Sequence, residues 1–456
     1  MIFFVYASTN NESIKGSMGA ADYSYFFVLK SYIPVLEKLG TVIQINKPAT
    51  ELADWYSAAK LMKKSCVFLQ FLPPHKIYAD TLCPSVCVFA WEYTTIPTES
   101  WGGSKWNDWR CALTQQGGAI THSTMASNSI TDAMGSRFNT IDVAAPVWDN
   151  YQSEAPADPS VTLDYQGLLF DSSIAGLDHG YKNEEQCQSY VSEVKEQSVE
   201  LSGVIYSSVF CPIDGRKNWP DLVSSFCYAF REQRDVTLVL KLIHFDDIQA
   251  IKETLPTLCK NAPFKCRIVV IAGFLSSKAY RSLINISSFI VNSSYGEGQC
   301  LPLMEFMSSG VPAIAPNHSA MADYMSDKTG FVVESSLEWT HWPHDPRILL
   351  KTMRYRLNWE SMRDAYSKSY KLISTDRPSY MSMQASAKAS LNTYCSQATA
   401  TEKLTSFFQR FTEDGFLDNS LVSLSKIEVF KFQLCHFLIK LVSTKRWVAL
   451  KSKELW

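Results

Sequence analysis

Two glutamates, Glu297 and Glu305, stand eight residues apart in a segment whose residue types suit the binding of a diphosphate. A strand is expected to end near Asn292, and a loop containing glycines then leads into a helix that begins near Leu301. The free amides and the dipole at the start of that helix form a site for an anion. Glu305, one turn inside the helix, can accept hydrogen bonds from ribose hydroxyls, and Glu297 in the loop can reach a group beyond the phosphates. A glutamate beside a helix N-terminus is also a plain capping feature, so Glu297 alone does not establish the site.

A basic pair, Arg216 and Lys217, follows an expected strand over 203–209 and precedes an expected helix from Leu222. Positioned cations stabilise the negative charge that grows when a nucleoside diphosphate departs. Arginine grips two oxygens at once, whereas lysine supplies a point charge. Lys241, at the end of another expected strand, is a third and weaker candidate. Without a supporting motif, such a pair is usually only solvated charge.

The segment Asn292–Gly330 resembles the donor-binding motif of family 4 glycosyltransferases, which are retaining enzymes of the two-domain GT-B fold. That motif reads Ser-x-x-Glu-Gly-Phe-Gly-Leu-Pro-x-x-Glu-Ala-Met, followed by Gly-x-Pro-Val-Ile-Ala. The matching positions are Ser294, Glu297, Gly298, Leu301, Pro302, Glu305, Met307, Gly310, Pro312, Ile314 and Ala315. The resemblance implies that Glu297 contacts the donor sugar and that Glu305 contacts the ribose.

The resemblance also implies roles for other residues around the donor. The amides around Gln299, Cys300 and Leu301 would hold the diphosphate, together with the basic pair. The spacing of that pair departs from the commoner Arg-x4-Lys pattern, so Lys217 is the better assignment of the two. Family members present backbone groups to the base after the strand that ends near Ile271, and they place a glycine-rich loop near the donor phosphates. The corresponding residues here are Phe274 and Leu275 for the base, and Gly19 for the phosphates.

Several positions depart from the family pattern and leave the identity of the sugar open. Gln299 and Cys300 stand for the usual Phe-Gly, and Phe306 stands for Ala. Ser319 and Ala320 replace a common glycine pair, and Asp323 replaces a Glu.

The first part of the chain offers candidates for acceptor binding. Glu92 follows an expected strand over 85–90, and its carboxylate could bond an acceptor hydroxyl or take its proton. The alternative is a buried, paired glutamate at a strand end. Trp101, Trp106 and Trp109 have faces that suit sugar rings, but they could equally belong to the core. His122 ends an expected strand and is a candidate to face the donor cleft. We expect no metal site and no bound cofactor, because neither the histidines nor an Asp-x-Asp motif supplies a ligand set.

The elements that must position these residues alternate between short apolar strands and helical patterns. Such alternation predicts parallel sheets built from βαβ units. Six strands are expected in the first part, near 2–6, 42–45, 66–72, 85–90, 119–122 and 140–144. Six more are expected near 203–209, 236–242, 267–271, 289–292, 311–315 and 330–334. Ligands of open α/β sheets bind beyond the carboxyl ends of the strands, so two such units predict a shared cleft.

This rhythm predicts an acceptor domain over 1–200, a nucleotide-sugar domain over 201–376 and a helical extension over 396–456. The stretch Tyr151–Asn183 interrupts the alternation and indicates a loop or an inserted hairpin. A helix over 380–395 is expected to cross back over the first domain. Residues Lys426–Trp456 hold seven Lys or Arg against two Glu, mixed with apolar residues. This last segment either packs on the body or contacts an anionic membrane or a partner.

Bulk composition is consistent with this organisation. The 456 residues carry a net charge of -2, which argues against a nucleic-acid partner. The twelve scattered cysteines form no CxxC pair and indicate reduced thiols in a cytoplasmic protein. The start of the chain lacks the pattern of a signal peptide, and no apolar run is long enough to span a membrane. We therefore expect a cytoplasmic protein, with peripheral attachment to the inner face of the cytoplasmic membrane as the alternative.

The sequence thus predicts a GT-B transferase that moves a sugar from a nucleotide diphosphate donor to a saccharide or lipid-linked saccharide acceptor. Retention of configuration and a role in bacterial polysaccharide biosynthesis follow from the resemblance alone. Two alternatives stay open: another GT-B enzyme, such as a sugar-nucleotide epimerase or a phosphorylase, and a catalytically inactive scaffold subunit.

Overall fold

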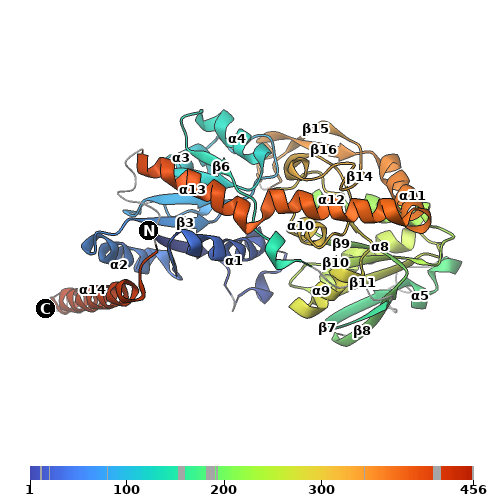
Figure 1. Ribbon diagram of the computed structural model, residues 1–456, viewed down its shortest axis with the longest axis horizontal. Helices are drawn as coiled ribbons and strands as arrows, with labels where there is room; N and C mark the ends of the chain where they lie inside the picture. The colour runs from blue at the N-terminus through green and yellow to red at the C-terminus, as the bar shows by residue number, and fades with distance from the viewer. Residues whose placement is uncertain are drawn as a thin grey trace.

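The computed structural model describes residues 1–10, 13–19, 21–79, 81–152, 160–180, 191, 194–343, 345–413 and 423–453. These residues form two α/β domains that lie side by side. Helix α12 runs along the second domain, and α13 continues along the first (Figure 1). No described helix is both long enough and apolar enough to cross a membrane.

The first domain is built on a six-stranded, wholly parallel sheet in the order β2-β1-β3-β4-β5-β6. Its strands are β1 (Ile2–Ala7), β2 (Thr41–Gln44), β3 (Cys66–Phe71), β4 (Ser85–Val88), β5 (Gly118–Thr121) and β6 (Thr140–Asp142). Its helices are α1 (Ala21–Leu39), α2 (Pro48–Leu61), α3 (Trp109–Leu113) and α4 (Thr124–Met134). The central strand β3 is buried along its whole length, which is why the sequence shows it as an unbroken apolar run.

The second domain is built on an eight-stranded sheet in the order β14-β13-β12-β9-β10-β11-β7-β8. Six of its strands are parallel: β9 (Val204–Phe210), β10 (Val236–Leu242), β11 (Arg267–Phe274), β12 (Phe289–Val291), β13 (Ala313–Ala315) and β14 (Gly330–Val332). Its helices include α5 (Ser172–Ala175), α7 (Trp219–Ala229), α8 (Asp247–Lys260), α9 (Ser277–Ile286) and α10 (Leu301–Ser308). The expected strands therefore exist, with ends that differ by a few residues.

A hairpin at the edge of this sheet moves the domain boundary from the one expected at residue 200. β7 (Ser160–Asp171) pairs antiparallel with both β11 and β8 (Lys195–Ser202), so the second domain begins near residue 160. The exposed and buried side chains of β8 alternate, because one face of this edge strand is open to solvent. Such a strand has no continuous apolar run, and the sequence therefore suggested only a loop or an inserted hairpin here.

Beyond the second sheet, the chain forms a separate hairpin and four helices. The hairpin consists of β15 (Ser335–His341) and β16 (Lys351–Leu357). The helices are α11 (Trp359–Thr375), α12 (Arg377–Cys395), α13 (Gln397–Glu413) and α14 (Lys426–Lys453). Near its start α12 is tied to the second domain by Tyr380, whose hydroxyl donates to the Ser288 carbonyl at 2.8 Å. Near its end it is tied to the first domain by Tyr394, whose hydroxyl donates to the His122 carbonyl at 2.8 Å.

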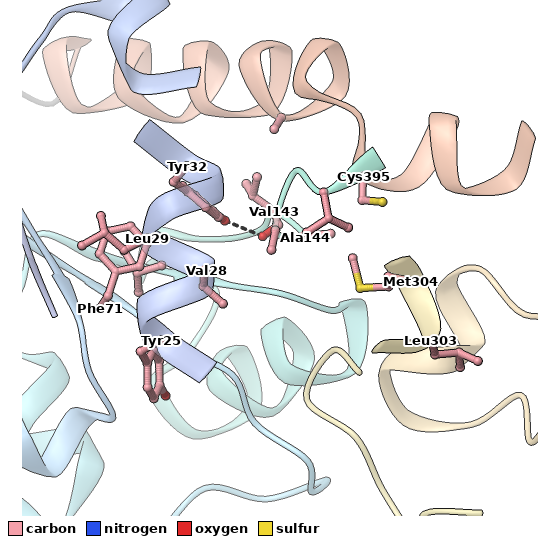
Figure 2. Packing of buried hydrophobic residues seen from close by; sticks show 14 of the residues in the cluster. Tyr25, Val28, Leu29, Tyr32, Phe71, Val143, Ala144, Leu303, Met304 and Cys395 are labelled. Atoms are coloured by element: carbon pink, nitrogen blue, oxygen red, sulfur yellow. Dashed lines mark hydrogen bonds between the residues drawn. The ribbon is translucent and has the colours of Figure 1, made fainter. Parts of the chain in front are cut away.

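One hydrophobic cluster contains buried residues from both domains and includes α10. Figure 2 shows Leu303 and Met304 of α10 opposite the loop that carries Val143 and Ala144. On the other side of this loop lies Tyr32 of α1, whose hydroxyl donates to the Val143 carbonyl at 2.5 Å. Packing of α10 against the first domain thus fixes the helix whose N-terminus the sequence marks as an anion site.

The cysteines differ from expectation at one position. Cys259 on α8 is disulfide-bonded. The other described cysteines are free thiols, as their scattered spacing predicts.

Candidate active site

The loop between β12 and α10 holds Glu297 in a buried position with its carboxylate fully engaged. Lys217 Nζ lies 2.7 Å from Glu297 Oε1, and Arg216 Nη1 lies 2.9 Å from Glu297 Oε2. The Ser294 hydroxyl donates to Oε1 at 2.5 Å, and the Asn292 amide donates to the same oxygen at 3.3 Å. We call Arg216, Lys217 and Glu297 the ion cluster. The structure therefore brings together the three charged residues that the sequence singled out from two distant segments.

A short 3-10 turn over Gly215–Lys217 presents both cations to this loop. Asp214 caps the turn by accepting the Arg216 amide at 3.1 Å, and its carboxylate also accepts from Arg216 Nη2 at 3.0 Å. Arg216 Nη1 donates further to the Gly296 carbonyl at 2.5 Å. Arg216 is thus held by three acceptors, whereas among the described residues the Lys217 ammonium donates a hydrogen bond to Glu297 alone.

The charges of the ion cluster stabilise one another. Burial alone would raise the pKa of the Glu297 carboxyl, but the charges of Lys217 and Arg216 outweigh it and lower that pKa well below the usual range. Burial alone would lower the pKa of Arg216, and the neighbouring carboxylates of Glu297 and Glu92 raise it instead. Arg216 and Glu297 are therefore charged at neutral pH.

Glycines let this loop press against the first domain. A Cβ on Gly298 would lie 2.8 Å from the Ala90 Cβ, and one on Gly296 would lie 2.8 Å from the Glu92 carbonyl oxygen. The Gln299 side chain, which stands where the family pattern has Phe, accepts the Ala145 amide at 2.6 Å. Gln299 is therefore a link to the first domain through its side chain.

Glu92 lies at the edge of the ion cluster. Its Oε1 is 3.6 Å from Arg216 Nη2, and a quarter of its side chain is exposed. The carboxylate is thus partly exposed and paired with Arg216, so its role in acceptor binding stays a prediction.

The start of α10 has the geometry that the sequence indicated. Cys300 adopts a left-handed conformation at the N-cap, Leu301 opens the helix, and Pro302 follows. The Asn292 amide lies 3.1 Å from Cys300 Sγ, and burial raises the pKa of the Cys300 thiol to about 12. Because that thiol stays protonated and no described side chain caps α10, the first amides of the helix are left to bind an anion.

Glu305 lies one turn further along α10 in a different environment. The Tyr280 hydroxyl of α9 donates to Glu305 Oε2 at 2.7 Å. Burial raises the pKa of Glu305 to about 7, although hydrogen bonds from Tyr280 and Tyr151 act in the opposite direction. Burial and the Glu305 charge raise the pKa of Tyr23 on α1 to about 12. Glu305 is thus surrounded by tyrosines from both domains.

The remaining donor candidates lie on the loops around these groups. Gly19 has φ +83°, and a Cβ there would lie 3.1 Å from the Ile243 carbonyl oxygen of the second domain. Phe274, at the end of β11, is 40% exposed, and Leu275 is buried.

Other sequence candidates lie outside the ion cluster. The Lys241 ammonium donates to the Leu242 carbonyl at 2.6 Å, and burial lowers its pKa to about 8. His122 is fully buried, with Nδ1 2.9 Å from the Val143 carbonyl oxygen, so it does not line an open cleft. Trp109 is also buried, in an aromatic cluster with Trp91 and Trp342.

The sequence did not assign roles to Ser319 and Ala320, which form hydrogen bonds with the backbone of Glu297. The Ser319 hydroxyl accepts the Glu297 amide at 2.9 Å, and the Glu297 carbonyl accepts the Ala320 amide at 3.1 Å. His318 stacks on Tyr355 of β16 with 4.2 Å between ring centroids. The sequence signalled this segment only as part of the motif, through the departure of Ser319 and Ala320 from the family's glycine pair.

Residues 254–361, which include the loop of Glu297 and all of α10, match the model of the family described as glycosyl transferases group 1. No curated protein sequence matches the chain. Among solved structures, the chain resembles Anabaena HepE in complex with UDP and glucose, with a TM-score of 0.52 and 13% identity over 90% of this chain and 99% of that one. It also resembles a glycosyltransferase from Rickettsia africae, with a TM-score of 0.51 and 14% identity over 90% of this chain and 97% of that one.

The fold is GT-B. A mutant of Staphylococcus aureus TarM also matches, with a TM-score of 0.49 and 13% identity over 78% of this chain and 58% of that one. This chain therefore matches little more than half of the TarM chain. The family match thus lies in the part of the chain that carries the loop of Glu297 and α10, and the likeness to solved structures extends over both domains.

Proposed function

We propose that this protein transfers a sugar from a nucleoside diphosphate donor to a saccharide or lipid-linked saccharide acceptor, with retention of configuration. One observation carries the proposal: Glu297 is buried between Lys217 and Arg216, directly before the uncapped start of α10. This arrangement combines two cations and free amides, which are the groups that a departing diphosphate requires. The HepE structure, which has the same fold, holds UDP and glucose.

Each group then has a part in the transfer. Lys217, Arg216 and the first amides of α10 stabilise the diphosphate as its bond to the anomeric carbon breaks. Glu297 faces the donor sugar while it holds the two cations in place, and Glu305 binds the ribose. The acceptor hydroxyl oxygen bonds to the anomeric carbon on the face from which the diphosphate leaves. Its proton passes to the leaving phosphate oxygen or to Glu92, which lies beside Arg216. Because side chains supply the positive charge, we expect transfer to proceed without a divalent metal.

The test begins with a thermal-shift screen of nucleotide sugars, since a ligand that favours the folded state raises the melting temperature. The stabilising donor is then incubated with the protein and a panel of saccharides, and nucleotide release and products are followed. A glycosyltransferase forms a glycoside only when the acceptor is present. An epimerase would instead release nucleotide and an epimerised sugar without an acceptor, and an inactive scaffold would bind the donor without turnover.

Peripheral attachment to a membrane is a second proposal, and α14 supports it. One face of α14 packs on α2, where Phe432 is fully buried and tilted against Trp55. The other face leaves large apolar side chains exposed: Ile427, Phe430, Leu434, Phe437, Leu438 and Leu441. Their spacing of three and four residues places them in one stripe. An exposed apolar stripe on a helix rich in Lys and Arg is typical of helices that lie on anionic membranes, where a lipid-linked acceptor would be found.

A further inference from the structure

A pocket of about 570 Å³ lies between the two domains, next to the segment that supports Glu297. One wall is the exposed face of α4 in the first domain. The opposite wall is the turn that follows β13, together with the hairpin of β15 and β16. The lining residues are Thr94, Thr124, Met125, Asn128, Ser129, Asp132, Asn317, His318, Ser319, Ala322, Asp323, Ser335 and Tyr355. We call this cavity the α4 pocket.

The α4 pocket shares a residue with the candidate active site. Ser319 lines the pocket, and its hydroxyl also accepts the Glu297 amide at 2.9 Å. Asp323 accepts the Thr124 amide at the start of α4 at 2.9 Å, which joins the two walls. A molecule in the pocket would therefore contact both domains and lie beside the loop that carries the ion cluster.

The lining suits a polyhydroxylated molecule. Thr124, Asn128 and Asp132 recur every four residues along α4, so a hydroxyl, an amide and a carboxylate form one row. Amides and carboxylates can bond pairs of neighbouring hydroxyls. On the opposite wall, the half-buried ring of Tyr355, which is stacked on the buried ring of His318, offers an aromatic surface for the apolar face of a sugar. Burial lowers the pKa of His318 to about 4, so this surface is uncharged at neutral pH.

The α4 pocket differs from the donor side in that its lining contains carboxylates but no cation. Its lining includes the carboxylates of Asp132 and Asp323 and no lysine or arginine. The ion cluster, by contrast, supplies two cations to Glu297. A phosphorylated ligand would meet like charge in the pocket without a compensating cation, which disfavours its binding.

We infer that the α4 pocket is the acceptor subsite and that it takes an uncharged sugar unit in preference to a phosphorylated one. This inference rests on the proposed glycosyltransferase function and adds the chemical class of the acceptor. For a lipid-linked acceptor, the terminal sugar would occupy the pocket and any phosphate would lie outside it.

Binding of small sugars to the full chain tests the inference. Saturation-transfer NMR is recorded in the presence of UDP with glucose, galactose, N-acetylglucosamine and maltose, and with glucose 6-phosphate as the charged counterpart of glucose. We expect at least one uncharged sugar to bind, and glucose 6-phosphate to bind about tenfold more weakly than glucose or not at all. Preference for glucose 6-phosphate, or binding of none of the uncharged sugars, would overturn the inference.

Variants on α4 locate the binding to the pocket. Asn128 is exposed and lines the pocket, whereas its neighbour Ser127 is half-buried and does not. Asn128→Trp should fill the pocket and weaken binding of the uncharged sugar at least tenfold, and Ser127→Trp should leave it within about twofold of wild type. Asn128→Lys should reverse the preference between glucose and glucose 6-phosphate, because it adds a cation. Equal sugar binding by wild type and Asn128→Trp would place the acceptor elsewhere.

The affinity for UDP, measured by calorimetry, separates this inference from the proposed function. Each α4 variant should bind UDP as wild type does, since Asn128 and Ser127 have no contact with the ion cluster. If UDP binds and the sugars are insensitive to Asn128, only the subsite assignment is wrong. If wild type binds neither UDP nor any nucleotide sugar, the proposed function itself is wrong.

Discussion

Glu297 and Glu305 lie eight residues apart on one loop and helix, yet the fold gives their carboxyl groups opposite surroundings. Both are buried, at 4% and 9% exposure. Glu297 is paired with two cations, which lower its pKa. Glu305 is bonded by neutral tyrosines, and burial raises its pKa to about 7. The comparison teaches that burial alone does not set the charge of a carboxyl group, because the partners that share its environment decide it.

The largest expected effect concerns the cations of the ion cluster. If Lys217 stabilises the departing diphosphate, its contribution should grow as negative charge grows in the transition state. Lys217→Ala should therefore lower the rate of sugar transfer by about 10²–10³, in line with loss of one electrostatic stabiliser. Affinity for the donor should fall less, because the first amides of α10 still hold the diphosphate. Single-turnover rates at saturating donor measure this effect.

Two further variants sharpen that test. Lys217→Arg should recover only part of the rate, since the guanidinium is larger and shaped for paired contacts. Lys265→Ala is the matched control, because Lys265 forms an exposed ion pair with Glu232 on the same domain. Its rate should equal that of wild type. A Lys217→Ala rate within about threefold of wild type would show that the lysine is not part of the chemistry.

A second effect tests the other half of the comparison through the pH dependence of stability. The pKa of Glu305 is raised to about 7 from the ordinary 4.5, so the folded state favours the protonated carboxyl. The stability that this provides is fully present below about pH 4.5 and is lost as the pH rises through 7. Glu305→Gln cannot ionise and avoids this loss. Relative to wild type, the variant should gain up to about 3 kcal/mol in free energy of unfolding between pH 4.5 and 8.

Urea unfolding of wild type and Glu305→Gln at several pH values measures this difference. Glu253→Gln serves as the control, because Glu253 is an exposed residue on α8. Its difference from wild type should stay flat over the same range. A flat difference for Glu305→Gln would mean that Glu305 is already ionised in the folded protein and resembles Glu297.

A third, smaller effect concerns the nucleotide. At pH 8, where the Glu305 carboxyl is largely ionised, Glu305→Ala should weaken binding of UDP by roughly 1.5–3 kcal/mol, because a charged hydrogen bond to the ribose is lost. Glu305→Gln should retain part of the affinity, since its amide oxygen still accepts one hydrogen bond. Calorimetry with free UDP reports the change without any contribution from catalysis. If Glu305→Ala binds UDP as tightly as wild type does, Glu305 does not contact the ribose and only packs against the surrounding tyrosines.

The fold was largely predictable because its central strands are buried on both faces and produce unbroken apolar runs, as in β3 and β10. The sequence did not predict β7, β8, β15 and β16 as strands. All four have exposed residues along their length, and β8 and most of β7 alternate between exposed and buried side chains. These strands pair with segments that lie far away in sequence or across a hairpin. The periodicity of apolar residues within each strand therefore says little about its pairing.

The motif resemblance predicted which residues belong to the ion cluster, but the sequence did not predict the contacts between them. Contact between Lys217 and Glu297 joins residues eighty apart, and no local pattern specifies it. The tyrosines around Glu305 were not predicted, because Tyr23, Tyr151 and Tyr280 come from three separate segments. The α4 pocket was likewise hidden, since its walls belong to different domains and its residues are individually unremarkable polar types.

The smallest expected effect on transfer comes from α14, which lies beside α2 at the far end of the first domain from β7 and β8 (Figure 1). Phe430 is 66% exposed, whereas Phe432, two residues on, is fully buried against α2. If the exposed stripe inserts into an anionic membrane, Phe430→Ser should lower binding to phosphatidylglycerol-containing vesicles roughly tenfold, as expected for loss of one buried aromatic side chain. Its turnover of a soluble saccharide should match wild type, because the described side chains of α14 pack on α2 and do not line the α4 pocket. Phe432→Ser should instead reduce stability, since it leaves a cavity over Trp55.

Vesicle sedimentation, turnover and thermal unfolding of both variants separate the two faces of α14. If Phe430→Ser binds anionic vesicles as wild type does, the exposed stripe does not insert into membranes. Neutral vesicles serve as the reference for all three proteins.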